Sequence, residues 1–210
     1  MKKIMYLAMI SVAALSVSCR KEPSMHDGEY LVYTAHDEKA DFSKYTTFNI
    51  PDEILVIGES EKPEYVNDSR AKAIIGDYRE QLEKAGFQYV ADKAAADLGV
   101  QITYTVKSRY YSDIVSDPYW WVDYPGYWSP YYWGNWNGWY HSYVVTYRYS
   151  TNALMAEIAD LTAAQDNDAK LPVLWSSFIN GEVSSNQYFT MVKIEDAIEQ
   201  AFSQSPYIRK

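Results

Sequence analysis

Cysteine is almost absent from this chain of 210 residues, which contains only Cys19. One cysteine cannot form a disulfide within the chain, and it cannot supply the several thiolates of a structural metal site. Packing and hydrogen bonds must therefore stabilise the fold. Apolar residues make up 48% of the chain, which is sufficient for one folded domain with its own core.

Positive charge is also scarce. The chain has 19 Lys and Arg residues against 28 Asp and Glu residues, which gives a net charge of −9 at pH 7. Proteins that bind nucleic acids need basic side chains to neutralise phosphate groups. We therefore predict no nucleic-acid partner.

The usual signals of catalysis and metal binding are missing too. The three histidines, at positions 26, 36 and 141, do not have zinc-binding spacing, and no phosphate-binding glycine loop or Gly-x-Ser-x-Gly motif occurs. Asp166-Asn167-Asp168 lacks the later Gly and Glu of a calcium loop, so it indicates a turn. We predict no metal, no cofactor and no enzymatic activity, although an acid and a base that only the fold brings together would leave no such signal.

No apolar run is long enough to span a membrane. The run from Ile4 to Val17 would form a helix of about 21 Å, against a hydrocarbon core of about 30 Å. It follows Lys2 and Lys3, and a short apolar run after a positive start is typical of a signal peptide. We assign residues 1–18 to this signal peptide.

The end of the apolar run, Leu15-Ser16-Val17-Ser18-Cys19, resembles a bacterial lipobox, although Ser16 stands where Leu is usual. The resemblance implies cleavage before Cys19 and attachment of acyl chains such as palmitate, which would anchor the chain to a membrane. The polar residues 19–29 are predicted to form a flexible tether, and Arg20-Lys21-Glu22 resembles the surface-export signals of Bacteroidota lipoproteins. We expect a lipoprotein of a Gram-negative cell envelope, in the outer membrane.

The folded part is predicted to start near Tyr30. Runs of β-branched and aromatic residues predict strands over 30–35, 45–50, 54–57, 98–106, 143–149 and 173–179. In 98–106 apolar and polar residues alternate, which predicts one buried face and one face in water. Apolar residues at helical spacing predict one helix from Asp68 or Ser69 to Gly86 and another from Thr190 to about Ser205.

The segment 153–164 is ambiguous, because its apolar residues fit both a helix and a strand. Helix propensity alone favours a helix.

Several other segments share their order and spacing with a known family: Asp41-Phe42-Ser43-Lys44-Tyr45-Thr46-Thr47-Phe48, Gly86-Phe87, Ala96-Asp97-Leu98-Gly99-Val100, Pro172-Val173-Leu174-Trp175 and Ile194 to Pro206. Over residues 30–207 the chain resembles the bacterial lipoprotein family of domain of unknown function 4136. The resemblance implies that 153–161 is a strand, and we follow it against propensity. Asn152 departs from the family pattern, which usually has Gly there, and so does the longer connection at 163–171.

Strands joined by short turns favour antiparallel pairing, and two helices can cover one face of a sheet. We therefore expect a single α+β domain over residues 30–210, with a mostly antiparallel sheet and two amphipathic helices packed on one face. These elements would form two layers. A long aromatic-rich insertion is expected between two of the strands, at about residues 112–142.

The insertion concentrates the aromatic residues, since 117–141 holds six of the seven tryptophans. Prolines and glycines interrupt any regular period in it, and loops of this length are usually functional or disordered. The candidate binding surface consists of its aromatic side chains: Trp120, Trp121, Tyr124, Tyr127, Trp128, Tyr131, Tyr132, Trp133, Trp136, Trp139 and Tyr140.

Four interpretations of the insertion are open. The rings could pack on one another and on the sheet, form a protein-binding surface, or stack on sugars whose hydroxyls bond to Asp123, Asn135 and Asn137. Insertion into a membrane interface is disfavoured, because 117–141 contains no Lys or Arg. We expect a non-catalytic protein-interaction or structural module of the envelope, with glycan binding as the alternative.

Overall fold

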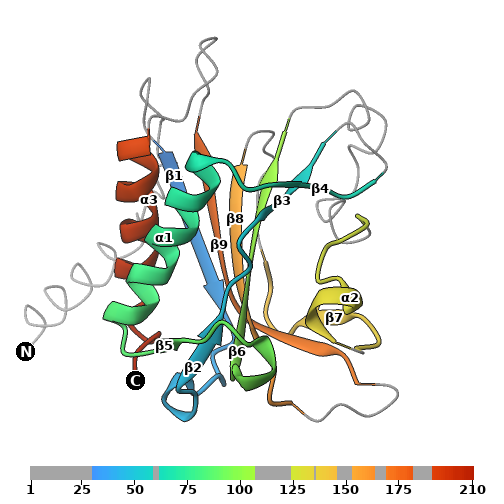
Figure 1. The fold of residues 1–210 in the computed structure, drawn as a ribbon. Helices are drawn as coiled ribbons and strands as arrows, with labels where there is room; N and C mark the ends of the chain where they lie inside the picture. Colours follow the sequence, from blue (N-terminus) through green and yellow to red (C-terminus); the bar gives the residue numbers. More distant parts are fainter. Residues whose placement is uncertain are drawn as a thin grey trace, which may run out of the picture.

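The computed structural model describes residues 30–58, 62–106, 124–134, 136–145, 153–163, 169–181 and 191–210. The predicted signal peptide (1–18), Cys19, the tether (19–29), Trp120, Trp121 and the turn at 166–168 lie outside these residues. The described part combines one large sheet with three α-helices (Figure 1), which confirms the predicted α+β class. None of the helices in it is long and apolar enough to cross a membrane.

Nine strands of the described part form one open sheet. They are β1 (Tyr30–His36), β2 (Thr47–Asn49), β3 (Ile54–Ile57), β4 (Glu64–Val66), β5 (Gln88–Tyr89), β6 (Leu98–Thr105), β7 (Trp139–His141), β8 (Ala153–Asp160) and β9 (Leu171–Gly181). The main order is β1-β9-β8-β6-β2-β5, with β3 also paired to β6, β4 to β3 and β7 to β9. The strands β8 and β6 are therefore in the middle of the sheet.

The sheet is mixed. The three longest ladders, β1–β9, β8–β9 and β6–β8, are antiparallel as expected. In contrast, β2 and β3 pair with β6 in parallel, one after the other along the same edge. The chain between β3 and β6 contains a helix, and such a connection returns the chain to the sheet in the same direction.

The ambiguous segment forms strand β8, so the strand implied by the family resemblance is confirmed. Ala153 to Ala159 are all buried, between β6 on one side and β9 on the other. This central position decides against the helix that local propensity favours, because β preference depends mainly on packing against neighbouring strands. The pairing with β9 shifts register between Ile158 and Ala159.

Two helices, α1 (Ser69–Lys84) and α3 (Met191–Ser203), lie side by side over one face of the sheet (Figure 1). The predicted ends of α1 are confirmed. The Asp68 side chain caps its first turn by accepting hydrogen bonds from the backbone N–H groups of Arg70 and Ala71, at 3.0 and 2.9 Å. Gly86 follows the helix with a φ of +101°, a left-handed conformation that favours glycine.

The core beneath these helices, which we call the helix-side core, follows regular periods. Its residues from α1 are Ala71, Ile75, Tyr78 and Leu82, and those from α3 are Ile194, Ala197, Ile198 and Ala201. Alternate residues of the central strands face them: Leu98, Val100 and Ile102 of β6, and Leu154, Ala156 and Ile158 of β8. A hydrogen bond between the Tyr78 hydroxyl and Ser177 Oγ, at 3.1 Å, joins α1 to β9.

The opposite face of the sheet is covered as well, so the prediction that β6 has one face in water is wrong. Gln101, Thr103 and Thr105 are 6%, 1% and 1% exposed. Gln101 lies beneath the described residues 124–134 and 136–145, which we call the aromatic segment and which cover this face of the sheet (Figure 1). This segment forms a third layer and, with the sheet, a second core that we call the aromatic-side core.

The aromatic segment contains two short regular elements, the single-turn helix α2 (Pro130–Trp133) and strand β7. β7 pairs in parallel with the first residues of β9, beyond the end of β1. The strand predicted over 143–149 is wrong at residues 143–145, which lie in no strand, and residues 146–149 are outside the described part. Here the neighbouring edge of β9 determines where the strand forms.

Candidate functional site

The aromatic side chains that were predicted to form a binding surface occupy three environments. Tyr127, Trp128, Trp133 and Trp136 are buried, Tyr124, Tyr132 and Trp139 are half-buried, Tyr131 and Tyr140 are exposed, and Trp120 and Trp121 lie outside the described residues. Burial removes the first four from any contact surface in this conformation. Tyr131, which is 98% exposed, and Tyr140, which is 43% exposed, remain as outward-facing rings.

Backbone turns direct these rings toward the sheet. Gly126 has a φ of +92°, and a Cβ atom added there would lie 2.7 Å from the Tyr65 hydroxyl. Trp128 has a φ of +44°, a conformation that costs a residue other than glycine about 1 kcal/mol or more. The hydrogen bonds of Trp128 offset this cost, because both its backbone N–H and its indole N–H donate to buried acceptors of the sheet.

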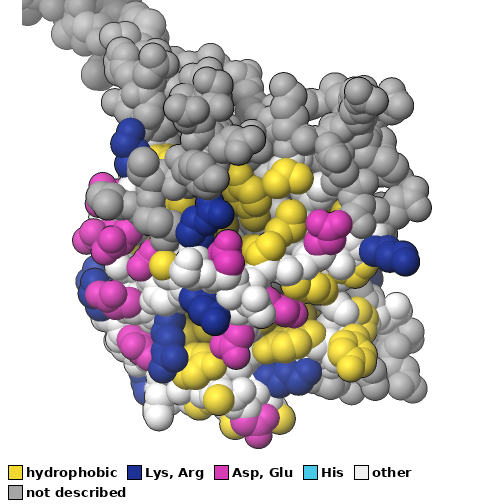
Figure 2. Space-filling view, turned by 45° about the horizontal axis from the view of Figure 1, so that its top comes forward, with side chains coloured by type: hydrophobic (Ala, Val, Ile, Leu, Met, Phe, Trp, Pro, Cys, Tyr) yellow, Lys and Arg dark blue, Asp and Glu magenta, His cyan; other side chains and the backbone are white. Residues whose placement is uncertain are grey.

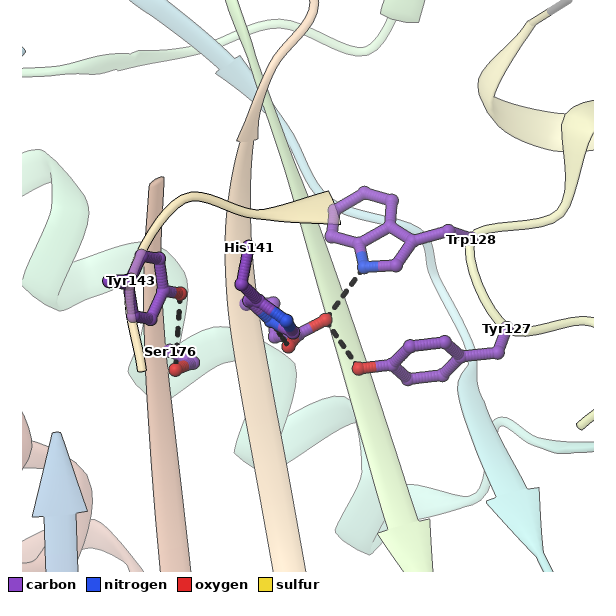
Figure 3. A network of polar contacts seen from close by, with 6 residues as sticks. Tyr127, Trp128, His141, Tyr143 and Ser176 are labelled. Carbon is purple, nitrogen blue, oxygen red and sulfur yellow. Dashed lines mark hydrogen bonds and ion pairs between the residues drawn. The ribbon is translucent and has the colours of Figure 1, made fainter. Parts of the chain in front are cut away.

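Glu157 of β8 is the centre of these contacts. Figure 3 labels its partners Tyr127, Trp128 and His141. The Glu157 side chain is 3% exposed. Oε2 accepts hydrogen bonds from the Tyr127 hydroxyl at 2.5 Å and from Trp128 Nε1 at 2.6 Å, and Oε1 lies 2.7 Å from His141 Nε2. A buried carboxylate is costly unless donors surround it, so these three side chains stabilise Glu157 while Glu157 holds them on the sheet.

Gln101 of β6 plays a similar part next to Glu157, its direct partner across the two strands. Gln101 Oε1 accepts hydrogen bonds from the backbone N–H of Trp128 and from Trp133 Nε1, both at 3.0 Å. These two donors determine which way the amide points. Within the described part of the chain, Gln101 Nε2 is buried without a hydrogen-bond partner.

A third polar side chain extends this row across the sheet. Ser176 of β9 is opposite Glu157 in register, and its Oγ accepts a hydrogen bond from the Tyr143 hydroxyl at 3.2 Å (Figure 3). Three adjacent strands thus each place one polar residue, Gln101, Glu157 or Ser176, under the aromatic segment. These three residues accept hydrogen bonds from the phenol O–H and indole N–H groups of the rings. Without such acceptors those groups would be costly to bury.

Close ring packing completes the layer. The Trp128 and Trp133 rings have centroids 5.1 Å apart, and Tyr132 meets Trp133 edge to face at 4.8 Å. Gly99 of β6 lies directly beneath, and an added Cβ atom would be 2.6 Å from Trp133 Cζ3. The absence of a side chain at Gly99 therefore lets the indole lie against the strand.

The half-buried margin of the segment is attached to the last residue of β2 and to the turn that precedes β6. The Tyr132 hydroxyl donates to Asn49 Oδ1 at 3.0 Å. Lys93 Nζ lies 4.4 Å from the centroid of the Tyr132 ring and also donates to the Tyr132 carbonyl oxygen. Burial raises the pKa of the Tyr132 phenol.

These contacts attach the aromatic segment to the sheet. His141 and Glu157 are the one hydrogen-bonded pair of a histidine and a carboxylate in the described part, and their side chains are only 11% and 3% exposed. Ring donors occupy both oxygens of Glu157. No group of three or more His, Cys, Asp or Glu side chains that could hold a metal ion occurs among the described residues. His36 stacks on Tyr207, with ring centroids 3.6 Å apart.

Sequence reasoning did not identify Glu157 or Gln101 as important. The alternation in β6 predicts that Gln101 faces water, and no motif includes Glu157. The available signal was one charged residue inside the apolar strand sequence Ala153-Leu154-Met155-Ala156-Glu157-Ile158-Ala159. Once that segment is a central strand, Glu157 must be buried and needs donors, and the aromatic insertion is the part of the chain richest in Tyr and Trp donors.

Comparisons with known proteins identify relatives of the whole domain. Residues 32–207 match the family described as Domain of unknown function (DUF4136). A DUF4136 family protein from Bacteroides thetaiotaomicron, known from a crystal structure, is 44% identical with a TM-score of 0.78, over 86% of this chain and 98% of the other. A PelC dodecamer from Paraburkholderia phytofirmans is 9% identical with a TM-score of 0.41, over 86% of this chain and 98% of that one. No curated protein sequence matches the chain.

Proposed function

The chain belongs to the DUF4136 family, and from this premise we propose that it is a lipid-anchored protein of the bacterial envelope that acts by contact with another envelope protein and not by catalysis. The contact surface is the outer side of the aromatic segment, around Tyr131 and Tyr140. The inner side of the same segment is attached to the sheet. This division between a buried and an exposed side is the basis of the proposal.

Tyr131 is the observation on which the proposal depends. It is 98% exposed, although both residues that follow it on α2 are held in place, Tyr132 by Asn49 and Trp133 by Gln101. An aromatic ring on an ordered backbone loses little entropy on binding, which is why such rings form strong contacts at protein interfaces. Tyr131 is thus presented to solvent on a backbone that is already fixed.

The non-catalytic part of the proposal is supported by the engagement of Glu157. A general acid or base must reach the proton of a substrate. Each oxygen of Glu157 instead contacts a ring donor of the aromatic segment, and the segment covers this face of the sheet. Neither the cavity between the helices and the sheet nor the one near the C-terminus has Glu157 or a residue of the aromatic segment in its described lining.

Glycan binding is less well supported. Stacking on sugars needs exposed flat rings, and three of the four described tryptophans in the segment are buried. We therefore treat sugar binding as an alternative outcome of the tests and not as a second proposal.

The lipid anchor at Cys19 is the other half of the proposal, and the apolar run and the lipobox-like residues before it support this anchor. Replacing Cys19 by Ala should release the protein from the membrane fraction and abolish metabolic labelling with palmitate. A Cys19→Ala protein that stays in the membrane fraction would refute the anchor. Ser18→Ala is the matched control, because it keeps the cysteine.

The contact surface is tested by a photo-crosslinking amino acid at position 131 in cells, with the same amino acid at exposed Lys72 on α1 as the control. We expect one envelope protein to crosslink at 131 and not at 72, and we expect Tyr131→Ala to lose that protein without a change in melting temperature. Equal crosslinking at both positions would refute the contact. A shift of tryptophan fluorescence on titration with cell-wall or capsular oligosaccharides would favour the glycan alternative.

A further inference from the structure

A second candidate site lies on the other side of the sheet. The structure contains a cavity of about 320 Å³ at the open end of the helix-side core, between the first turns of α1 and α3 and the strands β3, β4 and β6. It shares no lining residue with the aromatic segment. Its role is therefore separate from the function proposed above.

The cavity walls are aliphatic. Its floor consists of the buried side chains of Ile54, Leu154 and Ile194. Its rim includes Val66, which is exposed, and Ile74, which is half-buried. Figure 2 brings this end of the molecule forward and shows an apolar area bordered by charged side chains of both signs. Apolar side chains around an open hollow are typical of ligand sites.

Charge is confined to the mouth of the cavity. Among the described residues that line the cavity, Asp68 and Arg70 are the charged ones, and their side chains are about half exposed. Asp68 Oδ1 accepts the two backbone hydrogen bonds that cap α1, and those bonds contribute to a lowered pKa of Asp68. Asp68 Oδ1 thus caps the helix, while Asp68 Oδ2 lies 3.7 Å from an Arg70 guanidinium nitrogen in a half-exposed ion pair. A guanidinium has several N–H donors, so Arg70 can contact a second carboxylate at the entrance as well.

Tyr104 of β6 also lines the cavity. Burial raises the pKa of the Tyr104 phenol, the neighbouring Tyr30 adds to this effect, and the positive charge of Arg70 opposes it. Arg70 and Tyr104 are therefore within electrostatic range of each other. A guanidinium and a phenol beside an aliphatic hollow suit a carboxylate group attached to an aliphatic chain.

We propose that this cavity binds a single-chain aliphatic carboxylate, with the chain between Ile74 and the floor residues and the carboxylate beside Arg70. Sugars fit poorly, because the walls offer few hydrogen-bonding groups. Burial of the chain drives binding, and Arg70 discriminates between head groups.

The test uses residues 20–210. The match covers 86% of this chain and 98% of the crystallised chain of the Bacteroides thetaiotaomicron relative, so that relative crystallised as little more than this domain. Circular dichroism and a cooperative melting transition check that residues 20–210 are folded before binding is measured. The probe is 11-(dansylamino)undecanoic acid, whose fluorescence rises in an apolar site. We expect saturable binding and displacement by dodecanoate. Absence of saturable binding would overturn the proposal.

Ile74→Trp places an indole in the cavity and should weaken probe binding about tenfold or more, because the ring occupies volume that the aliphatic chain of the probe needs. Ala73→Trp, which places the same ring on the exposed side of α1, should leave binding unchanged. Val66→Gln on the peripheral strand β4 makes the rim polar without changing the core, and it provides a second test if Ile74→Trp does not fold. Unchanged probe binding in a folded Ile74→Trp or in Val66→Gln would overturn the proposal.

The head-group assignment is tested by competition. Arg70→Gln should weaken displacement by dodecanoate about threefold, the size expected for a half-exposed charge contact, and should leave displacement by dodecanol unchanged. Equal loss for both competitors would overturn the role of Arg70. Melting temperatures of all variants distinguish lost binding from lost folding.

Discussion

The two faces of the sheet are covered in different ways. On the helix-side core, residues at helical spacing in α1 and α3 meet alternate residues of the strands, and nearly all contacts are apolar. On the aromatic-side core, a segment without a regular period is attached through hydrogen bonds to Gln101, Glu157 and Ser176. A periodic element needs only a matching apolar surface. An irregular segment needs specific acceptors that determine where each ring lies.

The comparison suggests that aromatic richness does not by itself indicate a binding surface. Trp128 and Trp133 lie between the segment and the sheet, with their N–H groups on Glu157 and Gln101. Only Tyr131 and Tyr140 of the described candidates face solvent to a large extent. A binding role for this segment therefore concerns a few exposed rings on a layer that is otherwise part of the core.

The largest effect is expected from Glu157→Ala. The substitution leaves the buried donors of Tyr127, Trp128 and His141 without their acceptor, and breaking such a network costs about 3–5 kcal/mol of unfolding free energy. Chemical denaturation should measure this loss, and near-UV circular dichroism should show that the tryptophan environment changes.

The matched variant for the other face is Leu154→Ala, three residues earlier on the same strand and facing the helix-side core. It should cost about 2–5 kcal/mol while leaving the near-UV signal of the aromatic segment intact. If Glu157→Ala is as stable as the parent protein, the polar row does not hold the segment, and the comparison between the two faces fails.

Gly99→Val should have the next largest effect. The new side chain would collide with the Trp133 indole and approach Leu161 Cδ2, which lies 3.1 Å from an added Cβ atom. Overpacking of this kind costs about 1–3 kcal/mol of unfolding free energy. A double-mutant cycle with Trp133→Leu checks the cause, since the smaller side chain should recover part of the loss. If the two free-energy changes simply add, the cost of Gly99→Val does not come from a collision with Trp133.

Gly76→Ala tests the helix-side layer and, unlike the preceding substitutions, is expected to increase stability. Gly76 is inside α1 on its exposed side, and a Cβ atom added there meets nothing within 4 Å. Alanine should therefore stabilise the protein by about 0.5–1 kcal/mol through its higher helix propensity. Thermal unfolding measures the gain. A loss of stability would show that α1 is more restricted at this position than its exposed surface indicates.

The smallest effect is expected from Asp77→Asn, and it depends on pH. Burial, together with the carboxylates of Glu195 on α3 and Glu80 on α1, raises the pKa of Asp77 from 3.8 to about 6. The folded protein therefore binds this proton more tightly than the unfolded chain does, and stability falls as the pH rises from 3.8 through about 6.

Asparagine at position 77 should make the protein more stable above pH 6 and should flatten this part of the stability profile. Denaturation midpoints across the pH range provide the measurement. Glu38→Gln, which removes an exposed carboxylate in the turn after β1, controls for net charge. If both variants give the same profile, Asp77 has no special role between the two helices.

The sequence correctly predicted those elements that depend on interactions between residues close together in the chain. Asp68 and Gly86 delimit α1 because a capping carboxylate and a left-handed glycine act on their own backbone. The family resemblance identified Asp97 as a motif residue, and its role is a long-range one: Oδ2 accepts hydrogen bonds from the backbone N–H groups of Thr46 and Thr47, at 2.6 and 2.9 Å. These bonds join two family segments about fifty residues apart in the sequence.

Other features could not be predicted from local signals. The alternation in β6 predicts a polar face, but it does not reveal whether water or another layer covers that face. Tyr143 to Val145 have the alternation of a strand, yet the edge of β9 is paired with Trp139 to His141 instead. In both cases the deciding contact comes from a part of the chain that no local pattern connects to the element.

The sequence by itself determined the α+β class, the two long helices, the central strand β6 and the position of the aromatic-rich insertion, because spacing and capping act over a few residues. Only the tertiary structure decided that β8 lies in the centre of the sheet, that the second face of the sheet is buried, and which rings remain exposed. The physical reason is that Glu157 and Gln101 meet their ring donors across separations of 16 to 32 residues. How much each of these hydrogen bonds stabilises the fold depends on its burial, and only the assembled sheet provides that burial.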